Sequence, residues 1–259
     1  MKFIHLSDLH LLPHPQTIRG IDVIARLEAA VDSIGKNFSD AELCMVTGDL
    51  TDMGDAESYR DVRRILDRLP MPWHVLMGNH DVRSVAQAEL PDLPWHADGS
   101  LQYELTTDAG EFLILDSLVT REIGRLCETR LAWLKERLTA AEQAGRDVYL
   151  FLHHVPFDIG IRWLDGIKLE NGDQFQDVLK GFSNIRHMFF GHVHRPVHGS
   201  WHGVPFSTVR ATVHQAALQF GDTHLFIEEN PSYAVVLIDD TSVLIHDHSY
   251  LEENLPITK

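Results

Sequence analysis

Along the first 190 residues, short apolar runs alternate with longer segments in which apolar side chains recur every three or four positions. The short runs, rich in Val, Ile, Leu and Phe, predict buried strands at residues 2–6, 43–47, 74–77, 112–115, 148–152 and 187–190. The longer segments predict helices, with apolar positions from Ile24 to Ile34, from Tyr59 to Leu69, and from Leu131 to Ala141 before a stop at Gly145. Strands that alternate with helices predict a layered α/β fold.

Beyond about residue 200 the helical spacing gives way to strand-like stretches. Residues 205–213 form one, and residues 234–238 and 242–246 form a predicted hairpin around an Asp-Asp-Thr turn. A chain of 259 residues that is 44% hydrophobic is long enough to bury one large core. We therefore expect a single domain over residues 1–259, completed by β-strands.

Chemically active side chains follow five of the predicted strands. Because strands of an open α/β sheet gather ligands outside their carboxyl ends, side chains distant in sequence are expected to meet at one rim. The residues concerned are Asp8 and His10 after the first strand, Asp49 after the second, Asn79, His80 and Asp81 after the third, His153 and His154 after 148–152, and His192 and His194 after 187–190.

The types and spacing of these residues favour bound metal ions. Asp8 and His10 are one residue apart, so in extended backbone they point the same way, and His192 and His194 repeat that spacing. Imidazole together with carboxylate suits Zn, Fe or Mn better than Ca or Mg. Asp49 has two carboxylate oxygens, so it can bridge two cations. Two adjacent metal sites that share Asp49 are the economical arrangement.

Five blocks of sequence, in this order, carry a resemblance to a known family. The chain resembles the calcineurin-like metallophosphoesterase superfamily and, within it, the bacterial class III cyclic-nucleotide and glycerophosphodiester phosphodiesterases. The resemblance covers roughly residues 1–215. The blocks are D-L-H at 8–10, G-D at 48–49, G-N-H-D at 78–81, H-H-V-P at 153–156 and G-H-V-H at 191–194.

This resemblance implies a fold and a set of metal ligands. The fold is a four-layer α/β/β/α sandwich of two mixed β-sheets flanked by helices, with the part from about residue 200 to 259 adding strands to the second sheet. Two divalent transition metal ions, Fe(II), Mn(II) or Zn(II), are expected. The additional Tyr ligand of purple acid phosphatases is absent, which argues against a ferric site. The implied ligands are Asp8, His10, Asp49 and His194 for one ion and Asp49, Asn79, His153 and His192 for the other.

The resemblance also implies catalytic roles. His80, with the bridging Asp49, is the expected catalytic pair, because His80 faces the substrate while a metal-bound hydroxide attacks phosphorus. Asp81 is a candidate for orienting the His80 ring. His214, in A-T-V-H-Q, is a candidate for contacting substrate. We expect His154 to lie behind the ligands or at the surface.

Three functions remain open at this point. The first is hydrolysis of a small phosphodiester, a cyclic nucleotide or a glycerophosphodiester. The second is a phosphomonoesterase or protein phosphatase with the same dimetal core, and the third is a non-catalytic scaffold. The chain has no G-x-S-x-G or G-x-x-x-x-G-K sequence, so a serine hydrolase or P-loop enzyme has no support.

The composition of the chain limits the kinds of molecule that we expect it to bind. The 38 acidic and 22 basic residues give a formal charge of -16, which opposes binding to nucleic acids and anionic membranes. No apolar stretch approaches the ~20 residues of a membrane-spanning helix, and Asp8 interrupts the first apolar run too early for a secretory signal. We expect a small phosphodiester partner, no nucleic-acid or membrane partner, and a cytoplasmic location; a homo-oligomer is compatible with the sequence.

The remaining reactive residues receive structural interpretations. Cys44 and Cys127 are expected to be free thiols, because one distant pair is no disulfide framework. The loop at residues 157–171, with Trp163 and Ile167, is expected to overhang the site and influence substrate choice. Structural or surface positions are expected for His5, His74, His96, His187, His198, His202, His224, His246 and His248, although His246-Asp247-His248 has the spacing of a metal motif.

Overall fold

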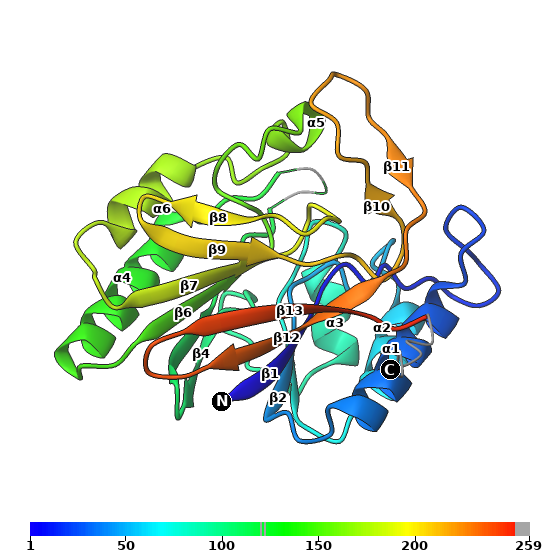
Figure 1. Ribbon diagram of the computed structural model, residues 1–259, viewed down its shortest axis with the longest axis horizontal. Coiled ribbons are helices and arrows are strands. Elements are labelled where there is room, and N and C mark those ends of the chain that lie inside the picture. Colours follow the sequence, from blue (N-terminus) through cyan, green and yellow to red (C-terminus); the bar gives the residue numbers. More distant parts are fainter. Residues whose placement is uncertain (120, 122, 252–259) are drawn as a thin grey trace, which may run out of the picture.

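Two β-sheets form the centre of the protein, which we describe from a computed structural model at residues 1–119, 121 and 123–251 (Figure 1). The first sheet has five strands in the order β13-β12-β1-β2-β3, and β1, β2 and β3 run parallel. Its strands are β1 (Lys2–Leu6), β2 (Leu43–Val46), β3 (Trp73–Val75), β12 (Ser232–Ile238) and β13 (Val243–Ser249).

The second sheet has six strands in the order β4-β5-β6-β7-β9-β8, of which β5, β6, β7 and β9 run parallel. Beside the two sheets, a short antiparallel pair joins β10 (Gln215–Ala216) to β11 (Phe226–Ile227). The strands of the second sheet are β4 (Tyr103–Thr107), β5 (Gly110–Ile114), β6 (Val148–Leu152), β7 (Ile185–Phe190), β8 (His198–Trp201) and β9 (Val204–Thr208).

The two sheets pack face to face through aromatic side chains. Phe3 of the first sheet lies edge-on to Phe112, Phe151 and Phe189 of the second, with ring centroids 5.4, 5.9 and 5.3 Å away. Such edge-to-face pairs stabilise a core beyond the area they bury. All four rings are fully buried, so the inner faces of the sheets form one continuous apolar layer.

Helices cover the outer faces of both sheets. On the first sheet lie α1 (Val23–Asn37) and α2 (Ala56–Leu66), which begin at Asp22 and Asp55, whose carboxylates accept hydrogen bonds from Ala25 N and Ser58 N. On the second sheet lie α4 (Glu128–Gln143) and α6 (Gly172–Leu179) (Figure 1). The expected helix-sheet-sheet-helix sandwich is confirmed. The other helices are α3 (Arg83–Glu89) and α5 (Arg162–Asp165).

The placement of the C-terminal strands is only partly as expected. Strands β8 and β9 do extend the second sheet, but the hairpin of β12 and β13 extends the first, where β12 pairs antiparallel with β1. The part of the chain from about residue 200 therefore adds strands to both sheets, and not to the second alone. Strand β1 exposes backbone groups on the side away from β2, and β12 satisfies them. Residues 252–259 of the expected C-terminal part lie outside the described residues.

Two further differences concern element boundaries. Strand β4 was not predicted, since Y-E-L-T-T has no continuous apolar run, yet it pairs with β5 through a tight turn ending at Gly110, whose φ is 143°. The strand predicted at 205–213 ends at Thr208. Within the described part of the chain, no helix combines the length and apolar character needed to cross a membrane.

Candidate metal centre

The loops that leave β1, β2 and β7 place five of the predicted ligands in left-handed backbone conformations. Residues other than glycine seldom adopt positive φ, and such strain clusters at functional sites, where the surrounding structure holds it. The five residues are Asp8 (φ 55°), His10 (47°), Asp49 (50°), His192 (70°) and His194 (47°).

One group of four buried side chains lies between the ends of β1, β2 and β7. Asp8, His10, Asp49 and His194 each offer one atom, and these atoms all lie within 4.8 Å of one another. His10 Nε2 is 3.0 Å from His194 Nε2 and 3.4 Å from Asp49 Oδ2. His194 Nε2 is 3.5 Å from Asp8 Oδ1. Four nitrogen and oxygen atoms therefore surround one point.

A second group adjoins the first and includes the same carboxylate. Asn79 Oδ1 lies 3.1 Å from His153 Nε2 and 2.9 Å from His192 Nδ1. His153 Nε2 is also 3.4 Å from Asp49 Oδ2. The Oδ2 atom of Asp49 is thus equally far from a histidine of each group. Asp49 therefore lies between the two groups, and its role as a ligand shared by two ions stays a prediction.

The hydrogen bonds on the outer side of each imidazole decide which atoms face inward. Three of these bonds end on carbonyl oxygens, which only accept, so the outer nitrogen carries the hydrogen and the inner nitrogen of the neutral ring presents a lone pair. The outer contacts are His153 Nδ1 to Thr47 O (2.7 Å), His192 Nε2 to Ile167 O (3.0 Å), His194 Nδ1 to His214 O (2.9 Å) and His10 Nδ1 to Asp52 Oδ1 (3.1 Å).

The amide of Asn79 is oriented in the same way. Its Nδ2 donates to Arg121 O at 2.8 Å, so Oδ1 is the atom that faces His153 and His192. Every inward atom of both groups is then a lone-pair donor, and such atoms about 3 Å apart repel one another unless a cation lies among them. Imidazole, carboxylate and amide oxygen fit a borderline transition metal ion, so the residues present fit the two divalent ions that the family implies.

The pKa values of Asp49 and His153 show that these two buried groups stabilise each other's charged forms. Burial opposes charge on the Asp49 carboxyl, but His153, His80 and His10 outweigh it and hold the pKa of Asp49 well below its usual range. Burial likewise lowers the pKa of His153, yet the neighbouring Asp49 carboxylate raises it to about 9.

Glycines of the sequence blocks let the backbone loops approach the cluster closely. A Cβ on Gly78 would lie 2.2 Å from Asp49 Oδ1 and 2.3 Å from Asp49 N. A Cβ on Gly191 would lie 2.2 Å from Ser7 Oγ and 2.4 Å from Thr47 O. Real side chains do not pack at such distances, so glycine at these two positions is a requirement of the site.

Asp52 is a contact residue that the sequence did not reveal. Its carboxylate bonds His10 Nδ1 at 3.1 Å and lies 3.4 Å from His80 Nδ1, which also donates to the Asp52 carbonyl at 2.9 Å. Burial lowers the pKa of His80, but the Asp52 hydrogen bond and the Asp49 charge raise it to about 9. The backbone N–H of His80 donates to Asp49 Oδ1 at 2.8 Å. Asp52 therefore links a metal-facing histidine to His80.

The expectation that Asp81 orients the His80 ring is wrong. The buried Asp81 carboxylate instead joins two loops through its hydrogen bonds. Burial and the charge of Asp49 raise the pKa of Asp81 to about 6, although these hydrogen bonds act to lower it. Its hydrogen-bond donors are Leu50 N, Thr51 N, Gly78 N and the Tyr59 hydroxyl.

His154 lies next to the ligands without joining them. It is fully buried, and its ring centroid is 4.8 Å from that of His192, so proximity alone groups it with His153 and His192. Its Nδ1, however, bonds Ser117 Oγ at 2.7 Å, whereas the inner nitrogens of His153 and His192 meet at Asn79 Oδ1. His154 Nε2 is buried and has no hydrogen-bond partner among the described residues, so the position of His154 outside the ligand set stays a prediction.

The H-D-H segment on β13 and the two cysteines lie elsewhere. Asp247 is engaged by Arg210, at 2.6 Å, and by Ser232. Cys44 is buried and Cys127 exposed, and both are free thiols.

A cavity of about 470 Å³ opens above the metal-facing atoms. The loop at 157–171 contributes Trp163, Leu164 and Ile167 to its lining, so this loop does overhang the site. His80 and His214 line the same cavity. The His214 ring lies 5.0 Å from that of His194.

Comparisons with known proteins agree with this geometry. The chain matches the family model described as calcineurin-like phosphoesterase over residues 1–196. It is 36% identical to a protein of Rhodopseudomonas palustris named a probable cyclic nucleotide phosphodiesterase, over 97% of this chain and 93% of that one. It is 28% identical to a glycerophosphodiester phosphodiesterase of Enterobacter lignolyticus, over 89% and 84% of the two chains.

Among solved structures, the fold is similar to that of a dimetal phosphatase from Danio rerio, with a TM-score of 0.74 and 15% identity over 97% of this chain and 96% of that one. A purple acid phosphatase from yellow lupin gives a TM-score of 0.67 and 14% identity, over 96% of this chain and 51% of the other. These two likenesses concern the fold. With the family model spanning most of its length, the chain belongs to the calcineurin-like phosphoesterases.

Proposed function

We propose that this protein is a metal-dependent phosphodiesterase that hydrolyses small phosphodiesters. The observation that carries the proposal is the convergence of lone-pair atoms on two adjacent points that share Asp49 Oδ2. Relatives named as cyclic-nucleotide and glycerophosphodiester phosphodiesterases support the choice of a diester. The proposed ligands are Asp8, His10, Asp49 and His194 for one ion and Asp49, Asn79, His153 and His192 for the other.

Two divalent transition ions, Fe(II), Mn(II) or Zn(II), would supply an activated water near neutral pH and neutralise charge on the phosphoryl oxygens. The residues of the chain orient this chemistry. Asp49 holds the two positions together, and the His80 N–H fixes the Asp49 carboxylate through Oδ1. Because His80 Nδ1 is committed to Asp52, Nε2 is the atom available to donate a proton to a leaving alkoxide. His214 is proposed to contact the substrate.

The same dimetal core would also serve a phosphomonoesterase. The decisive measurement compares bis-p-nitrophenyl phosphate with p-nitrophenyl phosphate, using protein stripped of metal and then resupplied with Mn(II), Fe(II) or Zn(II). We expect metal-dependent turnover of the diester, loss of at least a hundredfold in Asp49→Asn, and full activity in Asp177→Ala, an exposed acidic position on α6. Turnover of the monoester alone would favour a phosphatase, and no turnover with any metal would favour the scaffold.

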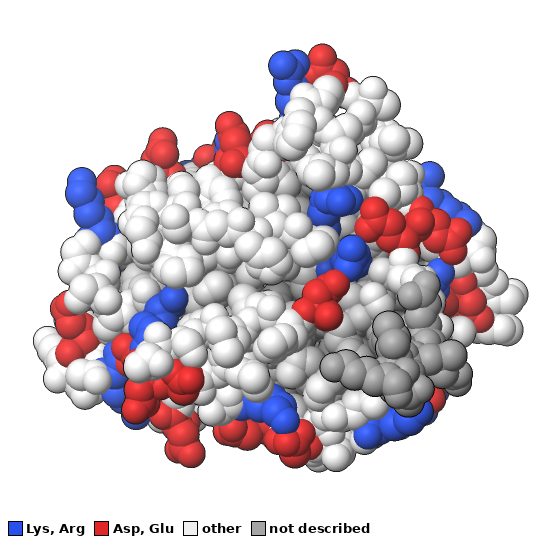
Figure 2. All heavy atoms as spheres, in the orientation of Figure 1, with Lys and Arg blue, Asp and Glu red and all other residues white. Residues whose placement is uncertain are grey.

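The kind of partner and the cytoplasmic location of the protein are also proposals. Acidic and basic side chains are mixed over the face shown in Figure 2, so the net charge of -16 does not gather into one acidic patch on that face. A small phosphodiester remains the proposed partner, rather than a nucleic acid or a membrane.

A further inference from the structure

The cavity over the metal centre continues into a wall of aromatic and basic side chains that the ligand set does not use. We call this the distal wall, formed by Arg19, Trp163, His224 and Phe226. The rings of Trp163 and His224 are stacked with centroids 3.9 Å apart, and Phe226 lies edge-on to Trp163 at 5.2 Å. The Arg19 guanidinium lies 5.0 Å from the Phe226 centroid. Trp163 lies in α5 and Phe226 in β11, so segments distant in sequence build this surface; Figure 1 labels both elements.

His214 connects the distal wall to the metal centre. Its ring lies 4.2 Å from Phe226 on one side and 5.0 Å from His194 on the other. Because these residues line one cavity of about 470 Å³, a phosphoryl group beside His194 has its ester substituent next to the wall. The wall is therefore placed to contact one of the two ester substituents of a phosphodiester.

Two donor groups on this surface have no ion-pair or hydrogen-bond partner among the described residues. Among the residues that the structure describes, Arg19 forms no ion pair, and the Trp163 indole N–H has no hydrogen-bond acceptor. The Trp163 indole N–H is a buried donor, and a buried donor without a partner is unfavourable, so a ligand atom that accepts a hydrogen bond there is favoured. Arg19 is exposed, so its guanidinium is free to donate to a ligand without first leaving an ion-pair partner among the described residues. Because both groups donate hydrogen bonds, the wall favours a ligand that carries hydrogen-bond acceptors.

We propose that the distal wall is a recognition subsite for the nucleobase of a nucleotide diester; this inference rests on the proposed phosphodiesterase function. A base offers a planar ring for stacking on aromatic side chains, together with ring nitrogens and carbonyl oxygens that accept hydrogen bonds. An aromatic pocket alone would also suit a quaternary ammonium group. The positive charge of Arg19 on Phe226 opposes that ligand, so choline-bearing glycerophosphodiesters are disfavoured.

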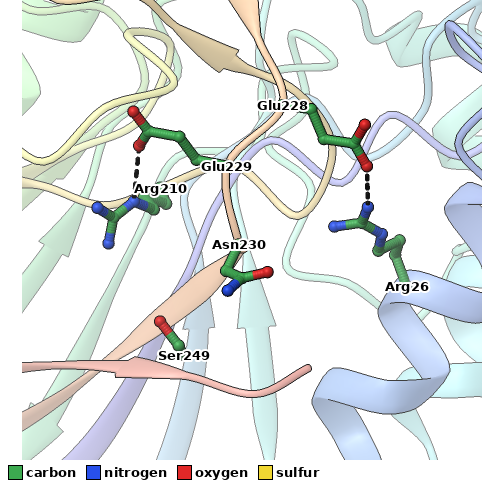
Figure 3. A pocket seen from close by; sticks show the side chains of 6 residues that line it. All are labelled: Arg26, Arg210, Glu228, Glu229, Asn230 and Ser249. Atoms are coloured by element: carbon green, nitrogen blue, oxygen red, sulfur yellow. Dashed lines mark hydrogen bonds and ion pairs between the residues drawn. The ribbon is translucent and has the colours of Figure 1, made fainter. Parts of the chain in front are cut away.

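The segment that follows Phe226 is fixed by ion pairs, which keeps the wall in place. Glu228 pairs with Arg26 of α1 at 3.2 Å, and Glu229 lies 3.5 Å from Arg210 (Figure 3). These residues surround a separate hollow of about 620 Å³, in which the acidic and basic groups already face one another. We read this hollow as an anchor for the β11 segment.

Two substrates with the same leaving group measure the contribution of the nucleoside that stays on phosphorus, and substitutions in the distal wall test whether that contribution comes through the base. Thymidine 5'-p-nitrophenyl phosphate and methyl p-nitrophenyl phosphate both release p-nitrophenol, and they differ in the arm that stays on phosphorus. We expect kcat/KM to favour the thymidine ester, and Phe226→Leu and Arg19→Gln to reduce that preference on the order of tenfold each. Two matched controls should leave the preference unchanged. They are Phe220→Leu, at an exposed position between β10 and β11, and Arg60→Gln, on α2.

Glycerophosphocholine as a competitor tests the charge of the wall. It should inhibit the parent enzyme weakly and Arg19→Gln more strongly. An unchanged preference in both wall variants, or strong inhibition of the parent by glycerophosphocholine, would overturn the proposal.

Binding separates this inference from the proposed function. If neither ester is hydrolysed, the phosphodiesterase proposal fails, and calorimetric binding of thymidine 5'-phosphate against methyl phosphate to the metal-loaded protein still decides the subsite. Tighter binding of the nucleotide in the parent, lost in Phe226→Leu and kept in Phe220→Leu, supports it. Equal binding of the two phosphates by the parent rejects it.

Discussion

His10 and His194 face each other with their Nε2 atoms 3.0 Å apart, although 184 residues separate them in the chain. His194 Nδ1 donates to a carbonyl oxygen and His10 Nδ1 contacts a carboxylate, so in the neutral rings both Nε2 atoms present lone pairs. The fold therefore holds two mutually repulsive groups together. A cation between them would convert this repulsion into a stabilising interaction.

Metal binding is consequently expected to raise thermal stability. A ligand at a hundred times its Kd stabilises the native state by about 2.7 kcal/mol, which corresponds to a rise in Tm of about 5–10 °C for a chain of this size. Differential scanning calorimetry of the stripped protein, with and without Mn(II) or Zn(II), measures the shift. His194→Gln should lose most of it, and Asp177→Ala should keep it. A parent protein whose Tm does not respond to either ion would contradict the expectation.

Asp52 is expected to act as a positioning residue. Its carboxylate contacts both His10 Nδ1 and His80 Nδ1, so Asp52→Asn removes the charge that orients two rings at once. Loss of such an outer partner typically costs about 10–100-fold in metal affinity or activity. Titration with Mn(II) followed by kinetics at saturating metal separates the two effects: we expect weaker binding through His10 and a lower kcat through His80. Unchanged values for both would show that the contacts are incidental.

The convergence of the seven proposed ligands was predictable, because polar residues after parallel strands collect at one edge of a sheet. Their role in binding metal stays a prediction. The partners of His80 were not predictable in this way. Asp52, rather than the adjacent Asp81, contacts the His80 ring. Asp52 follows Asp49, whose φ is 50°, and the direction of a side chain in such an irregular loop cannot be derived from the spacing of apolar residues.

Sheet membership of the C-terminal hairpin was unpredictable for a different reason. The nearly continuous burial of β12 is compatible with either sheet, because an apolar run indicates burial and not the strand with which it pairs. Its pairing with β1, in which Lys2 lies opposite Leu237, joins positions more than 200 residues apart. By contrast, Trp163 of the distal wall was visible in the sequence, but its assembly with His224 and Phe226 depends on contact between α5 and the segment that contains β11.

Two histidines in the core predict a loss of stability in acid. Burial, together with the proximity of His187, lowers the pKa of His5 to about 3, and burial, together with His198, lowers that of His187 to about 3. In the unfolded chain each titrates near 6.5, so below that pH the unfolded state binds more protons and stability falls until about pH 3. Stability is therefore retained above pH 6.5 and lost between 6.5 and 3.

The size of this effect can be measured by substitution. Between pH 7.5 and 5.5 one such histidine removes about 1.4 kcal/mol from the free energy of unfolding. Urea denaturation of metal-free protein at both pH values should therefore show His187→Gln losing about 1.4 kcal/mol less than the parent. His202→Gln, at a surface turn, is the control and should follow the parent. Equal losses in His187→Gln and parent would mean that His187 titrates in the native state.

Gly78 and Gly35 predict opposite outcomes for the same substitution. A Cβ at Gly78 would lie 2.2 Å from Asp49 Oδ1 and 2.3 Å from Asp49 N, whereas a Cβ at Gly35, inside α1, meets nothing within 4 Å. Gly35→Ala is expected to stabilise the protein by about 0.5–1 kcal/mol, because alanine loses less conformational freedom in a helix. Gly78→Ala must displace the shared carboxylate, so we expect lower stability, together with weaker metal binding and lower activity. Urea denaturation with metal titration checks both variants, and a Gly78→Ala protein that binds metal like the parent would show that Asp49 need not hold its position.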